Sequence, residues 1–251
     1  MENLLDNNKF YDQLASQYDS MISFEKSVNN KTNLLRNFIK PNTKSAADIG
    51  CGTGADSISL ASNGIKVTAF DPSTEMLKQA EINAKNFNVK INFQNFSAEK
   101  IPDSFNYSFD LIVSLGNTFA NIPQENFSDS IKKCSEILKP KGSILIQVLN
   151  YKKILNERKR IVSITKGGSK FFIRFYDFQE KNLIFNLLQF DENLPGKSNL
   201  TSTKLYPYVV EDFTSELENC GINKYSFYSD LNRNEYLELN SLNLIILATK
   251  G

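Results

Sequence analysis

A glycine-rich loop and a later aspartate could together bind a nucleoside. The loop reads Asp48-Ile49-Gly50-Cys51-Gly52-Thr53-Gly54, and it stands between a predicted strand and a predicted helix. Glycines permit a tight turn and let the backbone lie close to a ligand, where a Cβ would clash. Asp71 ends the next predicted strand, and its carboxylate can accept hydrogen bonds from both hydroxyls of a ribose. This arrangement favours nucleoside binding over a glycine turn without a ligand.

The loop alone leaves more than one nucleoside cofactor open. Its Gly50-x-Gly52-x-x-Ala55 spacing also fits the relaxed dinucleotide fingerprint, so an NAD(P)-binding protein is an alternative. That fingerprint requires neither the acid at 48 nor the glycine at 54. None of the ten tyrosines is followed by lysine four places later, so the Tyr-x-x-x-Lys pair of short-chain reductases is absent. The chain contains no histidine, which excludes any mechanism that needs an imidazole base.

The elements around the loop predict an α/β fold. From Ser45 to Leu149, short apolar runs alternate with helical stretches. The predicted strands are 45–49, 66–70, 90–93, 110–114 and 143–149, and the predicted helices are 55–63, 73–86 and 124–138, with a turn at 140–142. Strands that are apolar on both faces indicate a mostly parallel sheet with helices on both sides.

The pattern changes after Tyr151. A basic helix is predicted at 151–160, a hairpin at 170–178 and 182–191, and a loop at 193–202. A helix at 210–220 and strands at 224–229 and 242–249 complete the chain. We interpret 1–251 as one domain, in which 151–207 forms an inserted antiparallel β lid.

Composition limits the partners of the chain. Lys and Arg total 29 against 28 Asp and Glu, so no global charge attracts nucleic acid or anionic lipid. Three scattered cysteines predict neither a disulfide framework nor a metal site. The N-terminus lacks the basic and apolar regions of a signal peptide, and no apolar run suggests a membrane span. The expectation is a cytoplasmic protein; a homo-oligomer stays open.

Four motifs in order resemble class I S-adenosylmethionine (SAM)-dependent methyltransferases. They are the glycine loop, Phe70-Asp71-Pro72-Ser73, Phe109-Asp110-Leu111-Ile112-Val113 and Leu138-Lys139-Pro140-Lys141-Gly142. Three further stretches are similar to glycine N-methyltransferases and their relatives: Gly52 to Ile58, Leu115 to Asn121, and Asn150-Tyr151. The resemblance implies a Rossmann-like seven-stranded sheet with its last two strands reversed. It also implies SAM as cofactor and methyl transfer to a small molecule.

The resemblance implies roles for individual residues. The loop would surround the methionine half of SAM, Asp71 would hold the ribose, and Ser97 and Ala98 would line the adenine. The residues expected to contact SAM are Tyr11, Tyr18, Lys26, Asp48, Gly50, Cys51, Gly52, Gly54, Asp71, Pro72, Met76, Ser97, Ala98, Leu115 and Gly116. Asn117 and Tyr151 are the expected catalytic residues, which would orient the acceptor.

Three positions depart from the family pattern. Ser97 replaces the usual Asp or Asn at the adenine, and only Lys26 stands near the place of the arginine that binds the SAM carboxylate. Leu149 replaces the arginine that clamps the acceptor carboxylate in glycine N-methyltransferases. We therefore expect an amine or hydroxyl acceptor larger and less acidic than glycine. Arg174, in the hairpin, is the residue that could offset an acidic acceptor from the opposite wall.

Two other functions stay open. The basic residues within 152–160 would suit an RNA or protein methyltransferase, although a solvated helix face is the simpler interpretation. The hydroxyl at Ser97 would suit a SAM-binding protein without catalysis.

Overall fold

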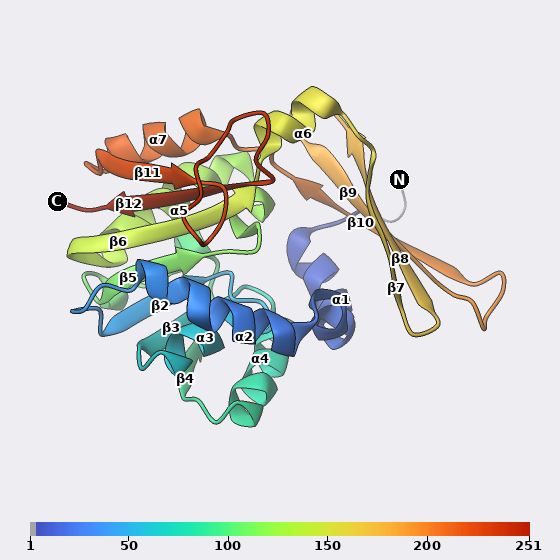
Figure 1. The fold of residues 1–251 in the computed structure, drawn as a ribbon, viewed down its shortest axis with the longest axis horizontal. Coiled ribbons are helices and arrows are strands. Elements are labelled where there is room, and N and C mark those ends of the chain that lie inside the picture. Colours follow the sequence, from blue (N-terminus) through green and yellow to red (C-terminus); the bar gives the residue numbers. More distant parts are fainter. Residues whose placement is uncertain (1–3) are drawn as a thin grey trace.

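The computed structural model describes residues 4–251, which form a body and a lid (Figure 1). The body is built on a seven-stranded sheet in the order β11-β12-β6-β5-β2-β3-β4. Its strands are β2 (Ser45–Ile49), β3 (Lys66–Phe70), β4 (Ile91–Gln94), β5 (Phe109–Ser114), β6 (Leu138–Leu149), β11 (Lys224–Tyr228) and β12 (Asn243–Thr249). The central pairs are parallel, as predicted.

One detail of the predicted sheet is wrong. Of the last two strands, only β12 runs against the others, because it pairs antiparallel with both β6 and β11. The predicted turn at 140–142 lies inside β6, where four residues bulge out between the pairs Phe109–Leu138 and Leu111–Ser143.

Helices cover both faces of this sheet. They are α2 (Phe24–Leu34), α3 (Ala55–Ser62), α4 (Thr74–Asn86), α5 (Gln124–Ile137) and α7 (Val210–Asn219). Two more helices, α1 (Asn7–Ile22) and α6 (Tyr151–Glu157), lie on the side of the lid (Figure 1). Short 3-10 turns lie at Leu35–Phe38, Ala98–Lys100, Asp103–Phe105 and Thr118–Asn121. Phe127 of α5 and Phe213 of α7 pack over Ile112 on one face. On the other face, Val28, Ile58 and Ala84 join α2, α3 and α4 into one layer.

The lid is a second sheet in the order β1-β10-β9-β8-β7. Its strands are β1 (Leu4–Leu5), β7 (Ile161–Gly167), β8 (Lys170–Phe178), β9 (Leu183–Asp191) and β10 (Ser198–Leu205). The predicted hairpin corresponds to β8 and β9. The loop predicted at 193–202 is wrong in its second half, because β10 pairs with β9 along its whole length. The helix predicted at 151–160 ends at Glu157, before the unpredicted strand β7.

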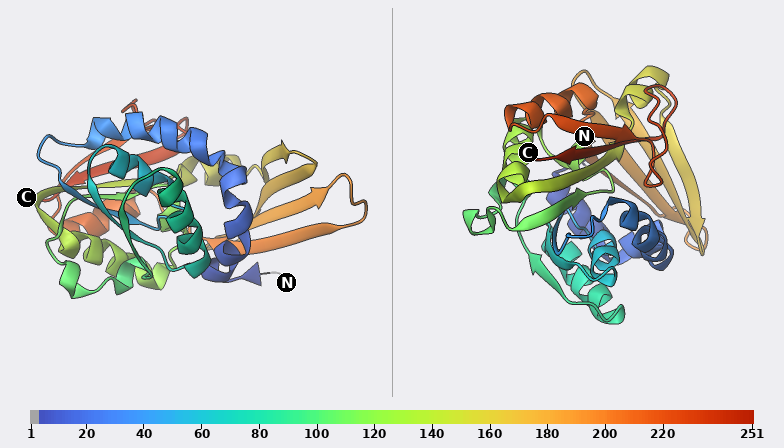
Figure 2. Two further views of the ribbon diagram at one scale, coloured as in Figure 1. Left: turned by 90° about the horizontal axis from the view of Figure 1, so that it is seen from below. Right: turned by 60° about the vertical axis from the view of Figure 1, so that its left-hand side comes forward.

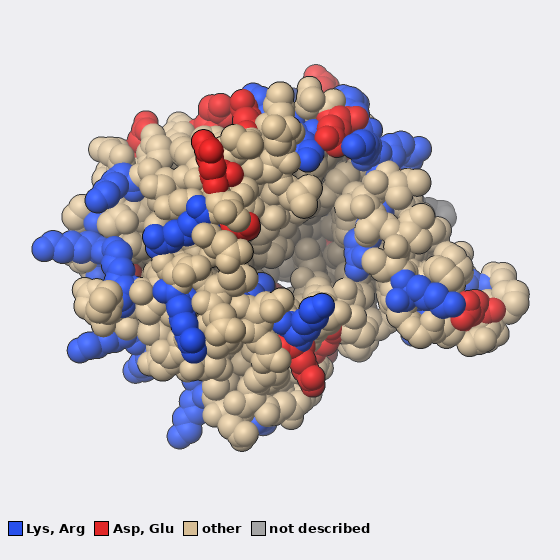
Figure 3. All heavy atoms as spheres, viewed as in Figure 1, with Lys and Arg blue, Asp and Glu red and all other residues tan. Residues whose placement is uncertain are grey.

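Helix α1 lies between the body and the lid, as the views in Figure 2 show. Its Phe10 and Leu14 pack against Met76 of α4 and against Phe172 and Leu187 of the lid. A hollow remains between the body and the lid (Figure 3). The lid therefore rests on α1 and encloses space next to the body.

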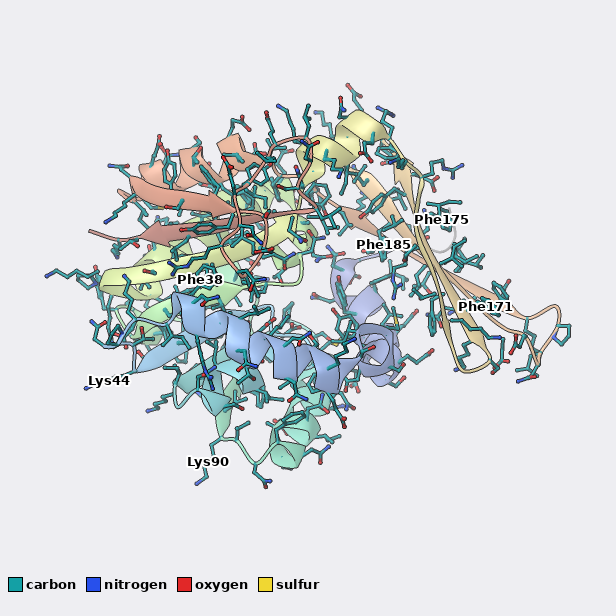
Figure 4. All side chains as sticks on the ribbon, viewed as in Figure 1. Phe38, Lys44, Lys90, Phe171, Phe175 and Phe185 are labelled. Carbon is teal, nitrogen blue, oxygen red and sulfur yellow. The ribbon has the colours of Figure 1, made fainter. Side chains whose placement is uncertain are left out.

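The two faces of the lid differ in what they contact. Phe185 lies on the side turned toward the body, whereas Phe171 and Phe175 lie on the other side (Figure 4). Because strand side chains alternate between faces, Phe172, Arg174 and Tyr176 belong to the side of Phe185.

Within residues 4–251, no helix has the length and apolar character needed to cross a bilayer. The expectation that no signal peptide is present depends partly on residues 1–3, which lie outside the described residues.

Candidate active site

A cavity of about 400 Å³ lies over the carboxyl ends of β2, β3 and β5 and is covered by α1. Parallel α/β sheets bind ligands at this edge. Most of the residues expected to contact SAM line it: Tyr11, Tyr18, Gly50, Cys51, Gly52, Asp71, Pro72, Met76, Ser97, Ala98, Leu115 and Gly116. Its volume is at the lower end of the ~300–1,000 Å³ range of small-molecule pockets.

The glycine loop is held against the end of β3. The backbone N–H groups of Gly50 and Cys51 donate to the Phe70 carbonyl at 2.7 and 3.1 Å. The next amide, of Gly52, donates to Asp71 Oδ2 at 2.8 Å. The other carboxylate oxygen of Asp71 accepts from the Ser73 N–H at 2.8 Å. Two amides therefore fix the Asp71 carboxylate on the cavity wall.

The buried carboxylate of Asp71 could accept hydrogen bonds from hydroxyl groups. Only 7% of the residue is exposed, and burial raises the pKa of Asp71 to about 6, although the amides of Ser73 and Gly52 oppose this rise. Hydrogen bonds to the ionised carboxylate would lower that pKa. The two hydroxyls of a ribose would supply such bonds, so Asp71 fits the role expected of it.

The glycines show where a ligand would fit. A Cβ placed on Gly50 would overlap the Thr118 side chain, so this glycine is required by the loop itself. A Cβ placed on Gly52 would meet no protein atom within 4 Å. Gly52 lines the cavity, so the space beside it is available to a bound molecule. This open backbone next to Asp71 fits SAM.

Gly54 lies next to α4 at the start of α3. It does not line the cavity; it begins α3 with a φ of 91°. A Cβ at this position would lie 3.2 Å from Ala80 Cβ. Gly54 therefore allows α3 to approach α4 closely.

An ion pair occupies the cavity wall beside the loop. Lys31 of α2 contacts Asp56 of α3 at 2.8 Å, and both side chains are largely buried. Asp48 lies behind them, 1% exposed, and accepts a hydrogen bond of 2.5 Å from Ser57 Oγ. Burial and the nearby charge of Asp56 raise the pKa of Asp48. Lys31 and Asp56 thus present both signs of charge to the ligand.

Lys26, expected near the SAM carboxylate, does not line this cavity. It is exposed on α2, whereas Lys31 lines the cavity. Sequence reasoning missed Lys31, which lies more than one helical turn beyond Lys26 on the same helix. The sequence signal that could have indicated Lys31 is Asp56, an acid in the first turn of α3 that needs a basic partner because this helix packs into the body.

Ser97 and Ala98, the residues expected beside the adenine, line the cavity. Ser97 donates its hydroxyl to Glu99 Oε1 at 2.7 Å, and both residues line the cavity beside Ala98. Glu99 was not expected at the site. It places a carboxylate next to the position where relatives have an acidic or amide side chain.

Helix α1 supplies the cover through a repeated Tyr-Asp pattern. Tyr11 and Tyr18 line the cavity. The aspartates that follow them attach α1 to α4: Asp12 accepts from Ser73 Oγ at 2.5 Å, and Asp19 accepts from Asn83 Nδ2 at 2.9 Å. The N-terminal segment therefore lies over the cavity as the resemblance implied.

Asn117 and Tyr151 lie together next to the cavity but do not line it. The Asn117 Nδ2 donates to the Tyr151 hydroxyl at 2.8 Å, and its Oδ1 accepts from the Leu149 N–H at 2.9 Å. Tyr151 is 1% exposed, and burial raises its pKa well above the usual value. The phenol is therefore neutral at pH 7 and can hydrogen-bond, but it cannot act as a base.

Cys51 lines the cavity without a nucleophilic role. Its burial raises the pKa of the thiol far above its usual range, and the nearby carboxylates of Asp71 and Asp48 add to this effect. A reactive cysteine needs an environment that stabilises the thiolate. Among residues 4–251, no cluster of potential metal ligands occurs.

Sequence comparisons agree with the motifs. Residues 46–142 match a family model described as a methyltransferase domain. The chain is 32% identical over 123 residues to glycine N-methyltransferase of Homo sapiens, covering 43% of this chain and 42% of that protein. It is 35% identical over 103 residues to a ubiquinone biosynthesis O-methyltransferase of Colwellia psychrerythraea, covering 41% of each. The matches thus span less than half the length of these relatives.

Solved structures share the whole fold. A SAM-dependent methyltransferase from Clostridium acetobutylicum superposes with a TM-score of 0.76 at 18% identity, covering 96% of this chain and 99% of that one. A SAM-bound amino pentose methyltransferase from Micromonospora echinaspora gives 0.69 at 13% identity, covering 90% and 91%. Residues 46–142 therefore match a methyltransferase domain, and the chain has the fold of SAM-dependent methyltransferases of known structure.

Proposed function

We propose that this protein transfers the methyl group of SAM to an amine or hydroxyl of a small molecule. The observation that carries the proposal is the enclosed cavity at the sheet edge, in which Asp71, the Gly52 backbone and the Lys31–Asp56 pair face one space. When bound there, SAM supplies a methyl group on a cationic sulfonium that an acceptor nitrogen or oxygen can displace.

The protein would bind each part of SAM with a different group. Asp71 would hold the ribose hydroxyls, and Glu99 would accept from the adenine amine beside Ser97. The methionine end carries one ammonium and one carboxylate. Lys31 would attract the carboxylate and Asp56 the ammonium, because their pair presents both charges at the cavity wall.

Positioning is the main contribution that these residues can make. Holding two reactants in alignment can contribute ~7–11 kcal/mol to lowering a barrier. Tyr11 and Tyr18 of α1 would exclude water above the cavity. Asn117 and Tyr151 would fix the acceptor side by hydrogen bonding, which requires no histidine.

The contacts of the basic residues at 152–160 favour a small acceptor over RNA. Lys152 pairs with Glu238, Lys159 with Glu157 and Arg160 with Asp177, while Arg158 lies over the Phe178 ring. Acids and a ring thus engage these charges, which favours a solvated helix face over a phosphate-binding surface. The glycine and ubiquinone enzymes among the relatives are methyltransferases for an amine and a hydroxyl by name.

Glycine itself is not the acceptor that we propose. Leu149 provides no cation beside Asn117, and a carboxylate buried there would lose its hydration without a partner. Steady-state turnover of glycine or sarcosine at the rate of a dedicated glycine enzyme would overturn this part of the proposal.

The test is methyl transfer from labelled SAM to a cell extract separated by size. We expect label in the low-molecular-mass fraction. Label confined to the RNA or protein fraction would refute the small-molecule acceptor, and binding of SAM without any transfer would indicate a non-catalytic SAM-binding protein.

A further inference from the structure

An arginine of the lid faces the body without an acidic partner. Arg174 lies on β8 between Phe172 and Tyr176, which share its face. Phe172 is buried against α1 and Tyr176 against the main core. Arg174 therefore points toward the body from the middle of the lid, between two anchored side chains.

The surroundings of Arg174 hold its guanidinium but do not neutralise it. Its Nη1 donates to Ser163 Oγ at 3.2 Å and to Thr165 Oγ1 at 3.3 Å, both on β7. Across residues 4–251, no carboxylate oxygen lies within 4.0 Å of it. Partial burial lowers the pKa of Arg174, yet a guanidinium stays charged at neutral pH. A charge that is partly desolvated and unpaired favours an anion as its ligand.

The position of Arg174 connects it to the cavity. Phe172, its neighbour on the same face of β8, belongs to the buried cluster against which Tyr18 packs. Tyr18 lines the cavity together with Lys31. Arg174 thus points into the hollow between the lid and the body. Figure 3 shows basic side chains at the rim of this hollow. Lys31 pairs with Asp56 and is assigned to the SAM carboxylate, whereas Arg174 has no acidic partner among residues 4–251.

We propose that Arg174 binds an anionic oxygen group of the methyl acceptor, a carboxylate or a phosphate. This inference rests on the proposed function and deepens it. The planar guanidinium can bind either group through two parallel hydrogen bonds, while Ser163 and Thr165 orient it from β7. The acceptor would carry its amine or hydroxyl near Asn117 and its anionic group at the lid.

The same geometry refines the expectation of a less acidic acceptor. Next to Asn117 the wall is apolar at Leu149, so an anionic group directly beside the methylated atom is disfavoured. An anionic group several bonds away reaches Arg174 instead. Glycine lacks that separation, so the two expectations agree on excluding it.

Anion-exchange separation of the labelled products tests this inference. We expect the labelled small molecule to be retained as an anion. The variant Arg174→Met should lower its rate of formation about tenfold to a hundredfold, the range for loss of a charged hydrogen bond. The SAM dissociation constant should stay unchanged, and Arg174→Lys should retain part of the rate. Lys170→Met, which removes one charge at the exposed end of the same strand, is the matched control and should behave as wild type.

A direct titration keeps the inference testable if no product forms. Inorganic phosphate and acetate are titrated separately into the protein saturated with S-adenosylhomocysteine, and the Arg174 Nε–H signal is followed by NMR. Saturable binding of either anion, lost in Arg174→Met and kept in Lys170→Met, supports the inference, and the tighter anion identifies the group. A neutral labelled product, or equal rates in wild type and Arg174→Met, would overturn it while leaving methyl transfer intact. Absence of both SAM binding and transfer would count against the proposed function instead.

Discussion

Adding one methyl group at Gly52 should separate cofactor binding from folding. A Cβ at this position meets no protein atom within 4 Å, and Gly52 lines the cavity beside Asp71. The Gly52→Ala substitution therefore adds volume where SAM would lie, without displacing any side chain. Overpacking costs about 1–3 kcal/mol, which corresponds to roughly a fivefold to 150-fold weaker affinity for SAM.

The backbone adds a separate cost that has a matched control. Gly52 has a φ of +53°, a conformation that costs an alanine about 1–2 kcal/mol. Gly64 has a φ of +80°, also meets no atom within 4 Å, and lies outside the cavity after α3. Gly64→Ala should therefore lower the melting temperature by a similar amount, about 2–8 °C for a chain of this size, and leave SAM affinity unchanged.

The assay is calorimetric titration of SAM into wild type, Gly52→Ala and Gly64→Ala, with thermal unfolding of each unliganded protein. Weak SAM binding in Gly52→Ala with a melting temperature equal to that of Gly64→Ala is the expected outcome. Equal SAM affinity in all three proteins would refute the placement of SAM against the Gly52 backbone.

Three further changes test individual contacts. We propose that SAM binds the ionised form of Asp71, whose pKa is raised by burial to about 6. Its affinity should then fall as pH drops below 6, by about tenfold per pH unit at most. Asp71→Asn should bind SAM weakly at every pH, and a steep pH dependence in that variant would assign the effect to another group. Lys31→Met should weaken SAM binding about tenfold, which is the effect of losing a charged contact. Lys26→Met, on the same helix, should leave SAM affinity unchanged. Equal losses of SAM affinity in the two variants would contradict the assignment of Lys31. Tyr151→Phe should reduce turnover without changing SAM affinity, because its hydroxyl contacts Asn117 and not the cavity wall; unchanged turnover would remove Tyr151 from the acceptor side.

The body of the fold was predictable because its signals are local. Apolar strands, the glycine loop and the Ser73 cap of α4 each occur within a few residues of one another. The lid was harder. The strand β10 reads as a polar loop after Pro195-Gly196, and it becomes a strand only by pairing with β9 and with the N-terminal β1. The pairing with β1, across nearly 200 residues, leaves no local pattern.

The candidate site divides in the same way. The loop and Asp71 could be located from spacing alone, because a βα unit fixes their relation. Lys31 could not, because its position depends on how α2 packs against α3, which brings it to Asp56. Glu99 could not be predicted either, because Ser97 occupies the position that corresponds to the acid of the family. The hydrogen bond from Ser97 to Glu99 is known only from the structure.

Binding of SAM in comparison with NAD tests the central claim most directly. Saturation at 100 times the dissociation constant should stabilise the protein by ~2.7 kcal/mol, a melting shift of roughly 5–10 °C. We expect this shift with SAM and S-adenosylhomocysteine, its loss in Asp71→Ala, and no shift with NAD. An equal shift with NAD, or no shift with SAM, would contradict the claim.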